Sequence, residues 1–328
     1  MTTPAATHQT FDLRPLLIAN MACTMAMMAF VSMIGPISRI LGMPTWQAGA
    51  AVTVSGVLWM LLARPWGQAS DRRGRRHILL LGTGGFTLAY WALCVFIDVS
   101  LQVLPSALLG FIGIMLGRGI IGVFYAAIPV GCNALIADHI EPRRRASAMA
   151  ALGAANACGL VIGPAIAALL SRYSLSLPFY AMAILPLLAF LVLRYKLKGQ
   201  ELHLRQAPRS VRLSDPRLHR PMAVAFVAML CVSIAQITVS FYALDRLRMS
   251  PADAAQTAGV ALAMVGVALI CAQLVVRKLE WPPLRMIRYG ALLSALGYAG
   301  SMLVDSARGL WLAFFVSAAG MGGVFPSF

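Results

Sequence analysis

The sequence is poor in charged residues, and above all in acidic ones. Only 12% of its 328 residues are charged, with 11 Asp and Glu in total, while 60% are hydrophobic and the mean hydropathy is +0.79. An ordinary soluble domain carries about 25% charged residues, because charged surface keeps it dispersed. The scarcity of charge excludes a soluble globular protein and indicates a membrane protein.

Patterns for metal, redox or nucleophilic chemistry are also missing. The six cysteines lie far apart inside apolar segments, which is typical of small core residues, and the five histidines lie in the N-terminal arm or in loops. No phosphate-binding loop of the Gly-x-x-x-x-Gly-Lys-Ser/Thr type occurs. We therefore predict a protein that is not an enzyme or an ATP-driven pump, with no cofactor and no metal site.

The charge that is present is mostly of one sign, with a formal net charge of +16. Such an excess can indicate a nucleic-acid partner. Here long apolar segments separate the basic residues, so they do not form one continuous face. We expect no nucleic-acid partner, and we expect a lipid bilayer around the chain.

Apolar segments long enough to cross a membrane dominate the sequence. A hydrocarbon core of about 30 Å takes roughly 20 helical residues, and helix is expected because backbone groups find no water there. The first segment is too long, and starts too far in, for a cleavable signal peptide. We predict ten spans, at Leu16–Leu41, Trp46–Trp66, Ile78–Ile97, Val103–Ala137, Ala146–Leu170, Leu177–Leu193, Met222–Leu244, Ala254–Val276, Met286–Val304 and Leu310–Phe328.

The basic residues set the expected orientation. If the N-terminus is cytoplasmic, 21 of the 27 Lys and Arg residues fall on the cytoplasmic side, five fall outside and Arg118 lies within a span. Cytoplasmic loops carry such an excess of Lys and Arg. We therefore predict a multi-pass protein of the cell (inner) membrane with a cytoplasmic N-terminus.

One turn between spans is unusual in its charge. The stretch "GQASDRRGRRHI", residues 67–78, separates the second and third spans and combines basic residues with Asp71, Gly67 and Gly74. A basic loop that only fixes topology would not need the acid or the glycines. Their spacing indicates a tight turn whose carboxylate meets a neighbouring arginine or a helix N-terminus.

This stretch resembles the signature loop of the major facilitator superfamily, Gly-x-x-x-Asp-(Arg/Lys)-x-Gly-(Arg/Lys)-(Arg/Lys), at every specified position. The resemblance implies a gating loop that holds the cytoplasmic side closed, with Asp138 or Arg145 as neighbours of its charges. The residues so assigned are Gly67, Asp71, Arg72, Gly74, Arg75 and Arg76.

Two further stretches resemble the same superfamily. "GIMLGRGIIGVFYAAIP" carries Arg118 in the fourth span, and the resemblance implies an intramembrane charge involved in coupling; a purely structural arginine is the alternative. "GLVIGPAIAALL" carries Gly159, Gly163 and Pro164 and resembles the fifth-helix motif of proton-driven drug exporters, with alanines where the closing glycines stand. A packing face without a directional role is the alternative there.

The resemblance also implies the architecture. We expect an all-α integral membrane fold of two six-helix bundles: residues 1–193, a basic cytoplasmic linker over 194–220, and a second bundle over 221–328. With ten segments in the chain, the second bundle is expected to be incomplete, truncated after about four helices.

The central helices should line a transport cavity. No acidic residue lies mid-segment, so proton antiport is implied by the resemblance alone. Polar residues of the central helices either line the cavity or bond neighbouring helices; the candidates are Asn20, Tyr125, Asn133, Gln236 and Tyr242.

Three functions fit these observations. The first is an ion-gradient-driven exporter of small amphipathic compounds, with a small-molecule substrate and a proton or other coupling ion as partners, working as a monomer. The second is a dedicated exporter of one endogenous product such as a siderophore, or an importer. The third is a non-transporting membrane protein, such as a receptor or a truncated paralogue.

Overall fold

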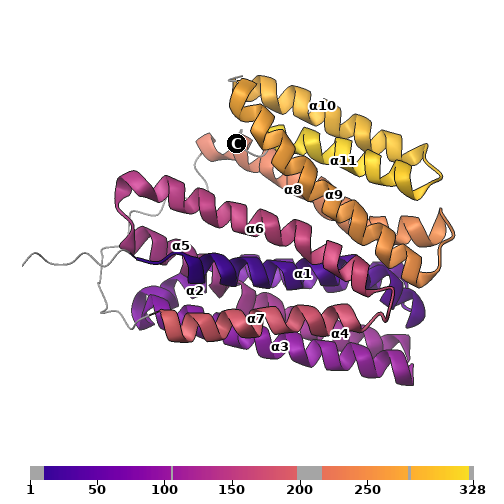
Figure 1. Ribbon diagram of the computed structural model, residues 1–328, viewed down its shortest axis with the longest axis horizontal. Helices are drawn as coiled ribbons and strands as arrows, with labels where there is room; N and C mark the ends of the chain where they lie inside the picture. Colours follow the sequence, from indigo (N-terminus) through magenta and orange to yellow (C-terminus); the bar gives the residue numbers. More distant parts are fainter. Residues whose placement is uncertain (1–10, 105, 198–215, 280–281, 325–328) are drawn as a thin grey trace, which may run out of the picture.

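The computed structural model describes residues 11–104, 106–197, 216–279 and 282–324, and every regular element in them is an α-helix (Figure 1). The helices are α1 (Arg14–Ile40), α2 (Thr45–Arg73), α3 (Arg75–Val103), α4 (Ala107–Tyr125), α5 (Ala127–His139), α6 (Pro142–Leu170), α7 (Leu177–Lys196), α8 (Pro216–Asp245), α9 (Pro251–Leu279), α10 (Pro283–Met302) and α11 (Ala307–Val324).

The helices confirm the all-α membrane-spanning fold. Each of the ten expected segments falls on one helix, except the fourth, which is divided between α4 and α5. Within the described residues, nine helical stretches are long and apolar enough to cross a membrane, with α4 and α5 counted as one. The ninth expected span, Met286–Val304 on α10, is outside that set; the first two turns of α10 carry the arginines Arg285 and Arg288.

The helices fall into two groups, α1–α7 and α8–α11, which we call the first and second helix groups (Figure 1). In the first group α1 runs through the middle and packs against α6 and α7, while α3 packs against α4 and α7. In the second, α11 packs against α9 and α10. The groups meet where α6 packs on α9 and where α1 packs on α8 and α9.

The outer faces of both groups are rich in exposed leucine. Leu88 of α3 is 74% exposed, Leu116 of α4 is 62% exposed and Leu312 of α11 is 65% exposed. In water such faces would promote association, whereas lipid tails are as apolar as leucine and accept them. This exposure fits a bundle that lies in a bilayer.

The break between α4 and α5 has a local cause. Pro129 has no backbone N–H and its ring crowds the carbonyl four residues earlier, that of Tyr125, where α4 ends. The indole Nε1 of Trp66 in α2 donates a hydrogen bond to the carbonyl oxygen of Val123, at 2.7 Å. A proline and a side chain from a neighbouring helix therefore fix the position of Tyr125.

The linker expected over residues 194–220 lies largely outside the described residues. α7 continues to Lys196 and α8 starts at Pro216, so both ends of the expected linker are helical. The tail of the last expected segment, residues 325–328, also lies outside the described residues.

Candidate functional site

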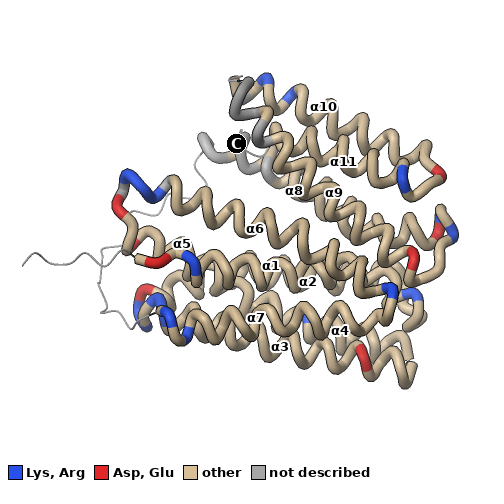
Figure 2. The backbone as a smooth tube through the Cα atoms, in the orientation of Figure 1, with Lys and Arg blue, Asp and Glu red and all other residues tan. Residues whose placement is uncertain are grey.

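The two ends of the helix bundle differ in charge (Figure 2). One end gathers the turn between α2 and α3 and the start of α6, and we call it the basic end; its described arginines include Arg72, Arg73, Arg75, Arg76 and Arg143–Arg145. The other end holds the C-terminal ends of α1, α3 and α8, and we call it the opposite end. The long helices run between these two ends.

The charged stretch between α2 and α3 is almost entirely helical. α2 continues through Arg73 and α3 starts at Arg75, so the turn consists of Gly74 alone, with φ +96°. That backbone angle strains any residue with a Cβ atom. Gly67 does not belong to the turn, contrary to the expected bracketing. It lies inside α2, where an added Cβ would be 3.7 Å from Val130 of α5, an ordinary contact.

Arg75 is the centre of an ion-pair network at the basic end. Its guanidinium pairs with Asp71 one turn earlier, and its Nε lies 3.0 Å from a carboxylate oxygen of Asp138 at the end of α5. A cation in the first turn of a helix is unfavourable for the helix dipole, and two carboxylates compensate for it here. Of the two expected neighbours, Asp138 joins the network, while Arg145 donates to the carbonyl of Ile140 at 2.9 Å.

Arg76 connects the same turn to α7. Its Nε donates to the carbonyl oxygen of Leu197 at 2.5 Å, and a terminal nitrogen donates to that of Arg194 at 3.0 Å. The last carbonyls of a helix have no partner within the helix, so Arg76 caps α7. The network thereby joins α2, α3, α5 and α7 at the basic end, all within the first helix group.

Arg118 is buried in the first helix group, and no carboxylate of the described residues pairs with it. It is 1% exposed, its guanidinium carbon lies 4.4 Å from the centre of the Phe30 ring, and a terminal nitrogen lies 3.2 Å from the Met27 sulfur. Its Nε has no hydrogen-bond partner among the described residues. The ring face and the thioether are weak substitutes for an anion. The expected intramembrane charge is therefore held by soft contacts with α1.

The small residues of the fifth-span motif lie on α6 and face both helix groups. An added Cβ on Gly159 would be 2.9 Å from the carbonyl oxygen of Met21, and one on Gly163 would clash with the backbone of Met25, both in α1. On the other side, a Cβ on Gly259 of α9 would be 2.6 Å from the carbonyl oxygen of Pro164. The motif thus lets α6 pack backbone to backbone against α1 and α9 together.

The two helix groups also touch at the opposite end. Arg39 of α1 pairs with Asp245 of α8, and the Ser240 hydroxyl donates to the carbonyl of Ser32 at 3.1 Å. Gly35 lies against Ser240 so closely that a Cβ would clash. Toward the basic end, α9 diverges from α6 (Figure 1).

The expected cavity residues separate into two sets. Asn20 is buried and Tyr125 half-buried, and the Thr24 hydroxyl lies against the phenol of Tyr125 and the backbone carbonyl of Asn20. Asn133, Gln236 and Tyr242 are not part of this contact: Asn133 is exposed in the middle of α5 and Gln236 is half-buried in α8.

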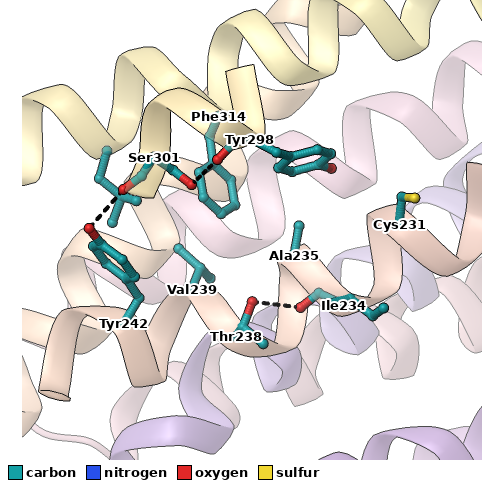
Figure 3. Close-up of a pocket in the computed structure, with 10 residues that line it drawn as sticks. Cys231, Ile234, Ala235, Thr238, Val239, Tyr242, Tyr298, Ser301 and Phe314 are labelled. Atoms are coloured by element: carbon teal, nitrogen blue, oxygen red, sulfur yellow. Dashed lines mark hydrogen bonds between the residues drawn. The ribbon is translucent and has the colours of Figure 1, made fainter. Parts of the chain in front are cut away.

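Tyr242 lines a separate pocket of about 290 Å³ in the second helix group, between α8, α10 and α11 (Figure 3). Its hydroxyl oxygen lies 2.8 Å from the carbonyl oxygen of Ser301 and 2.6 Å from that of Val304, and these two acceptors share its single hydrogen. These bonds satisfy the phenol, and the remaining lining is largely apolar, with Val239 and Phe314 among it. Tyr242 is therefore a helix-joining residue in this conformation.

Two residues of the polar contact around Tyr125 were not predicted from the sequence. Thr24 lies in the Met-rich part of α1, and Asn156 lies three residues before Gly159 in α6. Their side chains are hydrogen-bonded at 2.7 Å. The sequence did hold a signal for Asn156: it is a polar residue one turn before the motif glycine Gly159, and so lies on the same face of the helix.

Comparison with known proteins agrees with these features. A family model described as Major Facilitator Superfamily matches residues 16–328. The tetracycline resistance protein, class D, of Salmonella ordonez is 29% identical over 201 residues, which cover 60% of this chain and 48% of that protein. The class C protein of Escherichia coli is 28% identical over 284 residues, 81% of this chain and 65% of that protein.

A third relative, multidrug resistance protein 1 of Bacillus subtilis (strain 168), is 26% identical over 253 residues, 75% of this chain and 61% of that protein. The chain therefore spans less than two thirds of the length of these curated relatives.

Solved transporters share the fold at low sequence identity. An inward-facing bacterial homologue of the human lysosomal transporter Spinster superposes with a TM-score of 0.69 at 16% identity, covering 98% of this chain and 74% of that one. A D-xylose–proton symporter superposes with a TM-score of 0.68 at 12% identity, covering 95% and 80%. With a family model that matches nearly its whole length and transporters as structural neighbours, the chain belongs to the major facilitator superfamily.

Proposed function

We propose that this protein is a secondary transporter that exports small amphipathic compounds in exchange for protons, by alternating access between two helix bundles. Two observations support the proposal. Relatives at 26–29% identity are tetracycline and multidrug resistance proteins, and α6 carries the small-residue motif expected of drug exporters.

The packing of α6 is the observation that carries the proposal. Gly159 and Gly163 let α6 lie on α1, and the Pro164 turn lies against Gly259 of α9. Small residues allow close approach without interlocking side chains, so the angle between two such helices can change while their backbones stay packed. Pro164 also leaves the carbonyl of Leu160 without its helical partner, which eases bending. α6 is thus suited to be the pivot between the groups.

The excess of Lys and Arg supports placing the basic end in the cytoplasm. The conformation is then closed toward the outside by the contacts between α1 and α8, and it diverges toward the cytoplasm. We place the protein in the cell (inner) membrane, with a cytoplasmic N-terminus. Because one chain supplies both helix groups, we propose a monomer.

The ion-pair network at the basic end is proposed to keep the first helix group rigid. Arg75 and Arg76 satisfy their charges and hydrogen bonds within that group while the basic end is open. The group can then move as one body during the transport cycle, with Asp71, Arg72 and Gly74 at the surface that approaches the second group when this end closes.

Proton coupling rests on the drug-exporter likeness. Every acidic residue that the structure describes lies in a connection or within about two turns of a helix end. The coupling proton is therefore best tested by measuring proton flux directly.

Transport by inside-out vesicles tests the proposal. We expect vesicles that contain the protein to accumulate tetracycline when their interior is acidified, and to release it when a protonophore removes the gradient. Addition of tetracycline should also release protons from the interior. Vesicles without the protein are the control.

A panel of unrelated dyes separates a broad exporter from a dedicated one, because a dedicated exporter moves a single compound. Vesicles with correctly inserted protein that move neither compounds nor protons would contradict the proposal.

A further inference from the structure

Three helices of the first group meet at one hydroxyl group. The Oγ1 atom of Thr24 in α1 lies 2.7 Å from the amide oxygen of Asn156 in α6 and 3.1 Å from the phenol oxygen of Tyr125 at the end of α4. It also lies 2.8 Å from the carbonyl oxygen of Asn20. We call Thr24, Tyr125 and Asn156 the polar cluster.

The cluster has unused hydrogen-bonding capacity. A threonine hydroxyl has one hydrogen and two lone pairs, so Thr24 donates to Asn156 while the Asn20 carbonyl keeps its helical partner. The amide NH2 of Asn156 then has two hydrogens and no partner among the described residues. The Tyr125 oxygen also keeps a free lone pair. The cluster therefore offers the donors of Asn156 and the acceptor of Tyr125 side by side. The side chains of these two residues are half-buried.

The α6 motif builds this cluster. Asn156 and Gly159 lie one turn apart on the same face of α6, and a Cβ on Gly159 would be 2.9 Å from the Cβ of Thr24. The close approach that Gly159 allows brings the Asn156 amide to Thr24. Tyr125 reaches the same place because α4 ends there, at the break before Pro129.

The cluster lies next to the level at which the helix groups part. The tight contacts between α6 and α9 extend from Val161, which meets Gly266, to Ala168, which meets Gly259. Asn156 is five residues, about 7.5 Å along the helix, nearer the basic end. On α1, Thr24 is likewise two turns nearer the basic end than Ser32, whose carbonyl accepts a hydrogen bond from Ser240 of the second group. A compound that enters from the basic end would stop at the cluster.

Aromatic rings and charge complete the surroundings. The Trp59 ring lies edge-on to Tyr125 with centroids 6.1 Å apart and is 44% exposed, and Phe86 lies 5.8 Å from Tyr125 on another side. Arg118 lies seven residues before Tyr125, about 10 Å along the helix. No carboxylate among the described residues contacts the cluster. These surroundings favour a flat ligand that is neutral or negative over a permanent cation.

We propose that the polar cluster determines substrate specificity, by binding hydroxyl and carbonyl oxygens of flat aromatic compounds. A ligand carbonyl accepts from the Asn156 amide, a ligand hydroxyl donates to the Tyr125 oxygen, and the ring system lies against Trp59. This inference rests on the proposed transport function, and it names the contacts through which the substrate is selected.

Equilibrium binding to the purified full chain in lipid nanodiscs tests it. The probes are tetracycline, a fused-ring compound with adjacent hydroxyl and carbonyl groups, and ethidium, a flat permanent cation without oxygen. We expect Tyr125→Phe and Asn156→Leu each to weaken tetracycline binding by about tenfold, the effect of one lost hydrogen bond, and to leave ethidium binding unchanged.

Asn156→Asp places a carboxylate in the cluster, and we expect it to strengthen ethidium binding while it weakens that of tetracycline. Two matched controls remove similar groups elsewhere. Tyr180→Phe removes a phenol that bonds Asp98, and Thr83→Val removes a hydroxyl that bonds its own helix at Leu79. Neither control should change the binding of either probe.

The outcomes separate this inference from the proposed function. Wild-type tetracycline affinity in both Tyr125→Phe and Asn156→Leu overturns the inference even if transport is found, and so does a wild-type protein without saturable tetracycline binding. Binding that depends on the cluster, in a protein that transports nothing, supports the inference and contradicts the proposed function.

Discussion

The two ends of the seam between the helix groups are held in different ways. At the opposite end, close backbone approach at Gly35 and one ion pair, Arg39–Asp245, connect α1 to α8 across the seam. At the basic end, Arg75 and Arg76 are connected to partners in their own group. Glycine-mediated packing closes one end, whereas the charges at the other end stabilise a single group. In the proposed transport cycle, the basic end is therefore the end at which we expect the two groups to move.

The largest effect is expected from filling the contact between α6 and α1 inside the first helix group. Gly163→Val places a side chain against the Met25 backbone, and overpacking of this kind costs about 1–3 kcal/mol or more. We expect loss of tetracycline transport and a lower thermal unfolding temperature in detergent. Gly153→Val is the control on the same helix, because a Cβ there meets nothing within 4 Å. Equal loss in both variants would show that helix propensity, and not the contact between α6 and α1, is responsible.

A somewhat smaller effect is expected from Gly35→Val. The new side chain clashes with Ser240 and should separate α1 from α8 without breaking the first group. Alkylation of a cysteine introduced at Ser240, with the native cysteines replaced, should therefore become faster from the outer side. Gly49→Val, where a Cβ has open space, should leave the rate unchanged. An unchanged rate in Gly35→Val would mean that this contact does not close the opposite end.

Asp71→Asn tests the basic end. Arg75 keeps Asp138 but loses one of its two carboxylates. A partly exposed ion pair contributes at most about 1 kcal/mol, so we expect transport to fall roughly fivefold with normal expression. Asp305→Asn removes a carboxylate at the other end and should leave transport intact. Wild-type transport in Asp71→Asn would remove the gating role of this turn.

The smallest effect is expected from Arg39→Ala. Both partners of the Arg39–Asp245 pair are at least half exposed, 50% and 57%, so solvent and salt screen their attraction. We expect the alkylation rate of the cysteine introduced at Ser240 to rise about twofold in low salt, and to stay unchanged in high salt. Arg246→Ala, which breaks the exposed pair with Asp305 inside the second group, is the control. A twofold increase in the control as well would show that the effect does not come from the contact across the seam.

The positions of the spans could be predicted from the sequence because roughly 20 apolar residues in a row leave few alternatives. The charged stretch could not be assigned in the same way. Its composition resembles a loop, yet α2 continues to Arg73, since Arg75 and Asp71 satisfy each other across a one-residue turn. The prediction that Gly67 belongs to the turn was wrong for this reason.

The candidate site was only partly accessible from the sequence. Gly159, Gly163 and Arg118 carry motif signals, and the polarity of Asn20 and Tyr125 singled them out. The hydrogen bond between Thr24 and Asn156 depends on the angle at which α6 crosses α1, which no local pattern encodes. Gln236 and Tyr242 looked equivalent to Asn20 as candidates, but both lie on α8, and Tyr242 lines a pocket whose other residues come from α8, α10 and α11.

Distances across the two ends test the central claim most directly. Nitroxide labels on cysteines at Arg144 and Leu284 report the basic end, and labels at Tyr173 and Leu303 report the opposite end; all four positions are exposed. We predict that tetracycline and a pH gradient shorten the basic-end distance and lengthen the opposite-end distance in the same molecules. If both distances stay unchanged while tetracycline binds, the two helix groups do not alternate, and the account of this protein as a transporter is wrong.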